Sequence, residues 1–163
     1  MTTFLTDAIK TIVPSVIIAA FTSYLTVRLA ISRFYREKWW EKIMEAYSSL
    51  LESLHHMKNY AAEHWEDETN PEYLSEDKRR ELEREWKKFS GELRKSMDLA
   101  SFLLSSESLG ILAQYKNRKA EARRSPTTFE LIEQDLAAVS DCLEELKKAA
   151  KRDLTSKKFM HFN

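Results

Sequence analysis

The chain has 163 residues, with 26 Lys and Arg against 26 Asp and Glu, and therefore a formal net charge of zero. This balance argues against a general nucleic-acid binder, so we expect no specific nucleic acid among its partners. The single cysteine, Cys142, excludes an internal disulfide and suits a reducing compartment. The chain contains only 2 Gly and 3 Pro, and this scarcity of helix-breaking residues favours helix throughout.

The first predicted element is an apolar helix over residues 11–32, which contains one charged residue, Arg28. About 22 residues at roughly 1.5 Å each span about 33 Å, enough to cross a hydrocarbon core about 30 Å thick. We therefore predict a transmembrane helix that follows a short extracytoplasmic tail over residues 1–10. Two alternatives remain: a cleaved secretory signal, for which the apolar run is too long, and a buried helix of a soluble protein, which would not crowd basic and aromatic residues at one end.

The orientation of this helix follows from the basic residues near its two ends. Lys10 stands alone before it, whereas five basic residues lie at or beyond its other end, so the positive-inside rule places the C-terminal body in the cytoplasm and the N-terminus outside. We expect anchors at the membrane interface, although the tryptophans could equally begin the cytoplasmic core. The predicted anchors are Arg28, Arg33, Tyr35, Arg36, Lys38, Trp39 and Trp40.

Small and hydroxylated residues recur within the apolar helix at three- and four-residue spacing. Such residues let membrane helices approach closely and hydrogen-bond to one another, and a lone anchor has no need of them. We therefore predict that the protein is a homo-oligomer that packs partly through this helix. The predicted packing residues are Ser15, Ala19, Thr22, Ser23, Thr26 and Ala30.

Residues 33–154 are predicted to form one cytoplasmic domain of about four helices. The first continues from the membrane without a break and ends at Asn70-Pro71, because proline disfavours helix in the residue before it. Its apolar positions alternate by three and four, as in a coiled-coil seam. They are Trp40, Ile43, Tyr47, Leu50, Leu54, Met57, Ala61 and His64.

Three further helices follow at short intervals. Ser75 is predicted to cap the second helix, which ends near Ser105; Ser106-Glu107 caps a shorter third; and Thr128 caps the last. Together with the first, these amphipathic helices predict an all-α antiparallel bundle, followed by a C-terminal tail over residues 155–163. Their expected buried stripes are Leu82, Trp86, Phe89, Leu93, Met97, Ala100 and Leu104; Leu109, Leu112 and Tyr115; and Phe129, Ile132, Leu136, Val139, Leu143, Leu146 and Ala150.

Two segments resemble uncharacterised bacterial single-pass inner-membrane proteins. One is the juxtamembrane string Arg33-Phe34-Tyr35-Arg36-Glu37-Lys38-Trp39-Trp40-Glu41, an F-Y-x-E-K-W-W-E-like segment. The other runs from Asp135-Leu136-Ala137-Ala138-Val139 to Cys142-Leu143. The resemblance covers both ends of the body. It implies a bacterial inner-membrane protein and transfers no catalytic residue.

No motif for catalysis stands out in the sequence, so we predict no enzyme activity, catalytic residue, cofactor or metal. Glu52 with His55 has the spacing of a di-iron ligand pair but occurs once, which favours exposed or interfacial histidines. Cys142 lies beside an apolar stripe and is better explained as a small core residue than as a nucleophile. The basic group over residues 116–124 complements a helix C-terminus, with contact to anionic lipid as the alternative.

Two functions remain open at this point. The first is a non-enzymatic, membrane-tethered protein that oligomerises or holds a cytoplasmic protein partner at the bacterial inner membrane. The second is an oligomeric pore-forming or membrane-perturbing effector of a bacterial defence or toxin system. Membrane lipid is a partner in both, and the Ser and Thr residues of the membrane helix would pack in the first and line a pore in the second.

Overall fold

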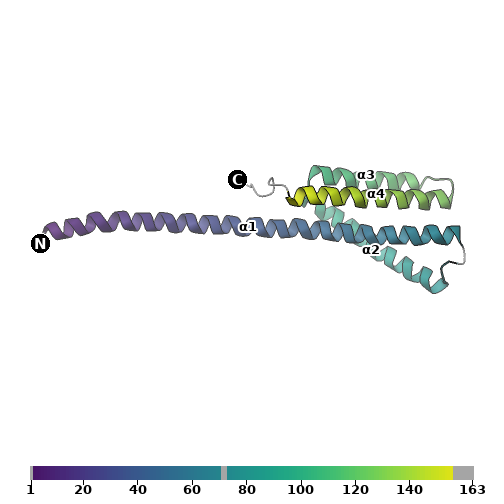
Figure 1. Cartoon of the computed structure of the whole chain (residues 1–163), viewed down its shortest axis with the longest axis horizontal. Helices are drawn as coiled ribbons and strands as arrows, with labels where there is room; N and C mark the ends of the chain where they lie inside the picture. Colours follow the sequence, from purple (N-terminus) through teal and green to yellow (C-terminus); the bar gives the residue numbers. More distant parts are fainter. Residues whose placement is uncertain (1, 71–72, 156–163) are drawn as a thin grey trace. The chain divides into compact units, whose positions relative to one another are not determined.

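The computed structural model describes the backbone of residues 2–70 and 73–155 and the side chains of residues 16–70 and 73–155. The described residues form four α-helices and no strand: α1 (Thr2–Thr69), α2 (Glu76–Leu103), α3 (Ser106–Ala122) and α4 (Thr128–Thr155) (Figure 1). The all-α prediction is therefore confirmed. The chain divides into two compact units, Met1–Trp39 and Trp40–Asn163.

Helix α1 ends at Thr69, as the Asn70-Pro71 break predicted. Asp67 in the last turn of α1 bonds to two residues near the start of α2. Its carboxylate accepts hydrogen bonds from Arg79 Nε at 3.0 Å and Arg79 Nη2 at 2.9 Å, and from the backbone N–H of Leu74 at 3.3 Å. Two parallel bonds between a guanidinium and a carboxylate fix geometry as well as charge, so this pair joins the last turn of α1 to the first turn of α2.

The N-terminal cap of α2 is the residue that the sequence predicted, whereas the caps of α3 and α4 each differ from the predicted residue by one position. Ser75 caps α2, since its Oγ accepts the Lys78 N–H, as predicted. The cap of α3 is Ser105 rather than Ser106-Glu107, because the extended Ser105 accepts the Ser108 N–H. The cap of α4 is Thr127 rather than Thr128, because Thr127 Oγ1 accepts the Glu130 N–H at 3.2 Å. Neighbouring hydroxyl residues compete for a cap, and the one whose side-chain oxygen accepts the N–H three residues later takes it.

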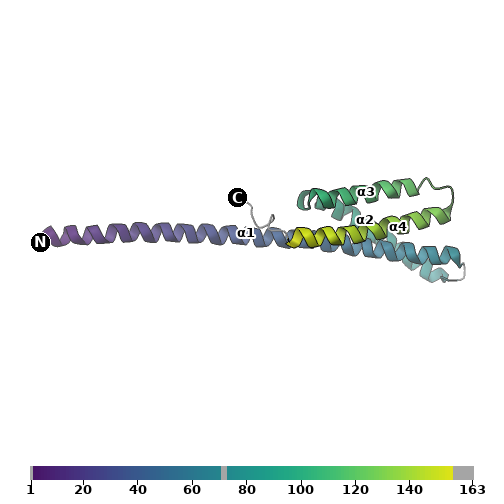
Figure 2. The same ribbon diagram turned by 45° about the horizontal axis from the view of Figure 1, so that its top comes forward.

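The hydrophobic core lies in the second unit and takes residues from all four helices. Leu50 and Leu54 of α1 and Leu146 of α4 are fully buried, and Leu93 of α2 and Leu112 of α3 belong to the same cluster. Helices α3 and α4 lie side by side in both views (Figures 1 and 2). Burying each apolar stripe against its neighbours supplies most of the favourable free energy of such a domain.

Most of the predicted stripe positions are buried, and the exceptions lie near the ends of the stripes or at the edge of the core. Trp40 is 41% exposed and Phe129 is 40% exposed, so the prediction that they are core residues is wrong. Phe129 is the second residue of α4 and contacts Trp65, near the end of α1, instead of the core cluster. A periodic pattern continues to the end of a helix, whereas packing stops where its neighbours stop. The half-buried positions are His64, Trp86, Leu109 and Leu136.

Candidate functional site

The apolar part of α1 exposes its side chains. Of the helices that the structure describes, α1 is the one whose length and composition suit a membrane crossing, and no part of its most apolar 18-residue window is buried. Ile18, Phe21 and Leu29 are each more than 60% exposed. Long runs of exposed apolar side chains are rare on soluble monomers, and they mark contact with lipid or with another protein.

The predicted packing residues share one face of α1. At about 100° per residue, positions 15, 19, 22, 23, 26 and 30 fall within an arc of about 100°. The side chain of Ser15 lies outside the described residues, and those of the other five are exposed. Thr26 Oγ1 donates a hydrogen bond to the Thr22 carbonyl at 2.8 Å, so this hydroxyl proton is used within its own helix. The periodicity places Arg28 on the opposite side of the helix from this arc.

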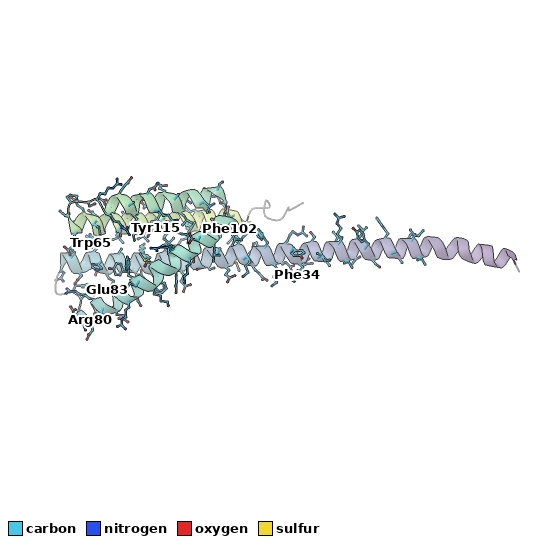
Figure 3. The ribbon with its side chains drawn as sticks, turned by 180° about the vertical axis from the view of Figure 1, so that it is seen from behind. Phe34, Trp65, Arg80, Glu83, Phe102 and Tyr115 are labelled. Atoms are coloured by element: carbon cyan, nitrogen blue, oxygen red, sulfur yellow. The ribbon has the colours of Figure 1, made fainter. Side chains whose placement is uncertain are left out.

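The predicted interface anchors are also exposed. Tyr35 is 69% exposed, and its ring meets that of Phe34, labelled in Figure 3, edge to face at 6.2 Å between centroids. Arg33 Nε lies 2.9 Å from Glu37 Oε1, one turn further along α1. Both partners are solvent-exposed, so this ion pair contributes little to stability. The remaining anchors, Arg28, Arg36, Lys38, Trp39 and Trp40, are exposed as well.

Three helices of the second unit meet at a buried polar cluster that the sequence did not predict. The Tyr47 hydroxyl of α1 donates a short hydrogen bond to Asp153 Oδ2 of α4 and lies 2.7 Å from Ser108 Oγ of α3. Ser105 Oγ, at the start of α3, donates to Ser108 Oγ at 3.2 Å. Burial and the Asp153 carboxylate raise the pKa of Tyr47 well above its usual value of 10.0, so the phenol stays protonated and can donate.

Cys142 is buried in the core, and two of the histidines contact neighbouring side chains. Cys142 is 4% exposed, which confirms it as a small core residue, and burial raises the pKa of its thiol to about 12. A thiol protonated at neutral pH is a poor nucleophile. His56 stacks on Phe89 at 3.6 Å between ring centroids, and His55 Nε2 lies 3.2 Å from Asn59 Nδ2. Across residues 16–70 and 73–155, no three His, Cys, Asp or Glu side chains are grouped to hold a metal ion.

The basic group at the end of α3 contacts α4, which the sequence did not reveal. Arg118 Nη1 lies 2.6 Å from Asp141 Oδ2, and Lys119 Nζ lies 3.4 Å from Asp135 Oδ2. Lys119 and Asp135 also line a cavity of about 370 Å³ within the second unit. The spacing of these charges along their helices is typical of solvated surfaces, and only the docking of α3 on α4 brings them together.

No protein-family model, curated protein or solved structure matches this chain at a significant level.

Proposed function

We propose that this protein is a non-enzymatic, membrane-tethered helical protein of the bacterial inner membrane, which oligomerises and presents a cytoplasmic bundle to a protein partner. The observation that carries the proposal is the complete exposure of the apolar segment of α1. No described residue of the chain covers it, and lipid or other copies of the helix are its natural surroundings.

The N-terminus lies outside and the bundle in the cytoplasm. Support comes from the charge count, in which the basic residues from Arg28 to Lys42 face the single Lys10 across the apolar segment. A second support is the free thiol of Cys142, which suits the reducing cytoplasm.

The cytoplasmic part is an antiparallel bundle of the second half of α1 with α2, α3 and α4. Contacts between α1 and α2 support this arrangement, since Ser49 bonds to Ser96 and His56 stacks on Phe89. Contacts between α1 and α4 also indicate that these two helices run antiparallel, because Tyr47 contacts Asp153 whereas Trp65 contacts Phe129. In each pair of helices, the later residue of one lies against the earlier residue of the other.

The membrane helices of several copies pack through the face that carries Ala19, Thr22, Ser23, Thr26 and Ala30. Small side chains permit close approach, and van der Waals packing is what drives association between helices in lipid. The alternative, a pore-forming or membrane-perturbing effector, would turn the same face towards water. The bond from Thr26 Oγ1 to the Thr22 carbonyl favours packing, because a hydroxyl bonded to its own backbone presents less polar surface to a water-filled pore.

Two exposed apolar side chains on α2 support the proposal of a cytoplasmic partner. Leu99 is 65% exposed and Phe102, labelled in Figure 3, is 82% exposed, although both belong to a helix that packs its other face in the core. Large apolar side chains exposed together on a folded domain favour protein recognition.

The test is the oligomeric state of the full chain in mild detergent, measured by light scattering. Ala19→Leu combined with Thr26→Leu keeps the segment apolar and places two large side chains on the packing face, so we expect a shift towards monomer. The single variants Ala19→Leu and Ala20→Leu form a matched pair, because Ala20 is rotated by about 100° from Ala19 and lies off that face. A wild-type protein that is already monomeric at micromolar concentration would refute the oligomer, and equal effects of Ala19→Leu and Ala20→Leu would refute the assigned face.

A further inference from the structure

A groove with apolar side chains in its lining runs between α2 and α3 in the second unit. The two helices start from one connection, where Leu104 follows α2 and Ser105 caps α3, and they diverge from it (Figures 1 and 3). Residues of both helices and of α1 line a cavity of about 250 Å³ here, which we call the α2–α3 groove. The large apolar side chains that line it are buried or half-buried: Met57, Trp86, Leu93, Met97 and Tyr115.

The charged side chains that line the α2–α3 groove are all basic: Arg94, Lys116, Lys119 and Arg123. Lys119 is paired with Asp135 of α4, whereas the other three are exposed and form no ion pair within the part of the chain that the structure describes. The chain as a whole carries equal numbers of acidic and basic residues, so the groove is a local concentration of positive charge. Carboxylates bind guanidinium groups through two parallel hydrogen bonds, and an acidic partner is therefore complementary to this groove.

The α2–α3 groove has the length of a short helix. At 1.5 Å per residue, α2 advances by about 16 Å between Trp86 and Met97, which is about three turns. The lining positions of α2 recur at intervals of four and three residues, at Trp86, Ser90, Leu93 and Met97, as on a helix face that packs against another helix. An amphipathic helix laid along such a face inserts its own apolar side chains at the same intervals.

The position of the α2–α3 groove favours a cytoplasmic protein over membrane lipid. Along α1, Met57 lies about 25 Å from Trp40, a predicted anchor at the membrane interface. The headgroup region on one side of a bilayer is about 5–8 Å deep, so in the proposed orientation lipid headgroups end well before the groove.

We propose that the α2–α3 groove binds an acidic amphipathic helix of a cytoplasmic protein, whose apolar side chains enter the groove and whose carboxylates pair with Arg94, Lys116 and Arg123. This inference rests on the proposed function, since it names the chemistry of the cytoplasmic partner. Leu99 and Phe102 do not line the groove, so it is a second surface of α2.

The probe is a fluorescent peptide of about 18 residues, long enough to form a helix, with leucine at intervals of three and four residues and glutamate elsewhere. Its anisotropy is measured against the full chain in mild detergent, with protein-free micelles as the baseline. Saturable binding is expected. The same peptide with lysine in place of glutamate, and an isomer whose leucines form no helical stripe, should each bind at least about tenfold more weakly. Absence of binding, equal binding of the three peptides, or equal competition by single-stranded DNA of the same charge would overturn the proposal.

Arg94→Glu and Lys95→Glu form a matched pair of variants, because both residues are exposed on α2 and only Arg94 lines the groove. Arg94→Glu should weaken binding of the acidic peptide by about tenfold, and Lys95→Glu should leave it unchanged. Equal losses in the two variants would indicate general attraction between charges instead of contact in the groove, and would overturn the proposal.

A second matched pair tests the space between the helices. Ala120 and Ala113 are both exposed on α3, and only Ala120 lines the groove. Ala120→Trp should block peptide binding with the helical content preserved, and Ala113→Trp should bind as the wild type does. Unimpaired binding by Ala120→Trp would overturn the proposal. The oligomeric state tests the proposed function separately, so a chain that oligomerises and binds no peptide would contradict this inference alone.

Discussion

The Tyr47 hydroxyl donates a hydrogen bond to the Asp153 carboxylate, although 106 residues separate the two along the chain. The bond joins the middle of α1 to the last turns of α4, and Ser108 at the start of α3 joins the same cluster. Buried polar groups of this kind stabilise a fold only when every partner is present.

Tyr47→Phe is therefore expected to destabilise the protein by about 1–3 kcal/mol, the cost of leaving a buried acceptor short of a donor. The measurement is urea unfolding followed by circular dichroism. Tyr73→Phe is the control, because Tyr73 is 45% exposed and its loss should change stability by less than about 0.5 kcal/mol. Similar urea midpoints for the two variants would mean that the hydrogen bond of the Tyr47 hydroxyl does not contribute to the stability of the fold.

Core substitutions should have the largest effects. Leu50 is fully buried and Leu143 is 3% exposed, so Leu50→Asp or Leu143→Asp places an uncompensated charge in the core and should cost several kcal/mol. Ser48→Asp introduces the same charge at an exposed position of α1 and serves as the control. An unchanged melting temperature for Leu50→Asp would show that this stripe faces water in solution.

Gly91→Ala should stabilise the protein. Gly91 lies inside α2, its φ is not positive, and an added Cβ would meet no atom within 4 Å. Alanine gains about 0.5–1 kcal/mol over glycine in a helix interior, partly because it restricts the unfolded chain. The expected result is a higher melting temperature for the full chain, and a lower one would reveal a contact at this position.

Alkaline pH should unfold the protein progressively. Burial raises the pKa of Cys142 from 9.0 to about 12 and also raises the pKa of Tyr115 above 10.0, so the folded state holds these protons more tightly than the unfolded state. Their contribution to stability is complete below about pH 9 and is lost as the pH rises towards 12. The urea midpoint should fall over this range, and it should fall less steeply in Cys142→Ala, which lacks the thiol. Parallel curves for the two proteins would contradict the role given to Cys142.

The orientation predicts the behaviour of fusions at Asn163. If the proposed orientation holds, a reporter that is active only in the cytoplasm should function there and one that is active only outside should not, because the positive-inside rule assigns the end that carries Arg33, Arg36 and Lys38 to the cytoplasm. The reverse pattern would overturn the charge-count argument.

The sequence by itself determined the helices. Their number, the end of α1 at Asn70-Pro71, the cap at Ser75 and most buried stripe positions follow from local signals: periodicity, a proline and an exposed hydroxyl. The apolar segment of α1 could also be predicted from the sequence, since length and composition decide whether a helix can cross a membrane.

Only the tertiary structure decided which polar residues meet. In the sequence, Tyr47 looks like any other apolar position of its stripe. Asp153 looks like any other acidic residue near a helix end, and Asp135 looks like any other charged residue beside a core position. Helix docking sets the register between them, and register depends on the packing of whole faces rather than on local sequence. For the same reason, the ends of the stripes at Trp40 and Phe129 are exposed: periodicity follows the helix, whereas burial follows the neighbouring helices that cover it.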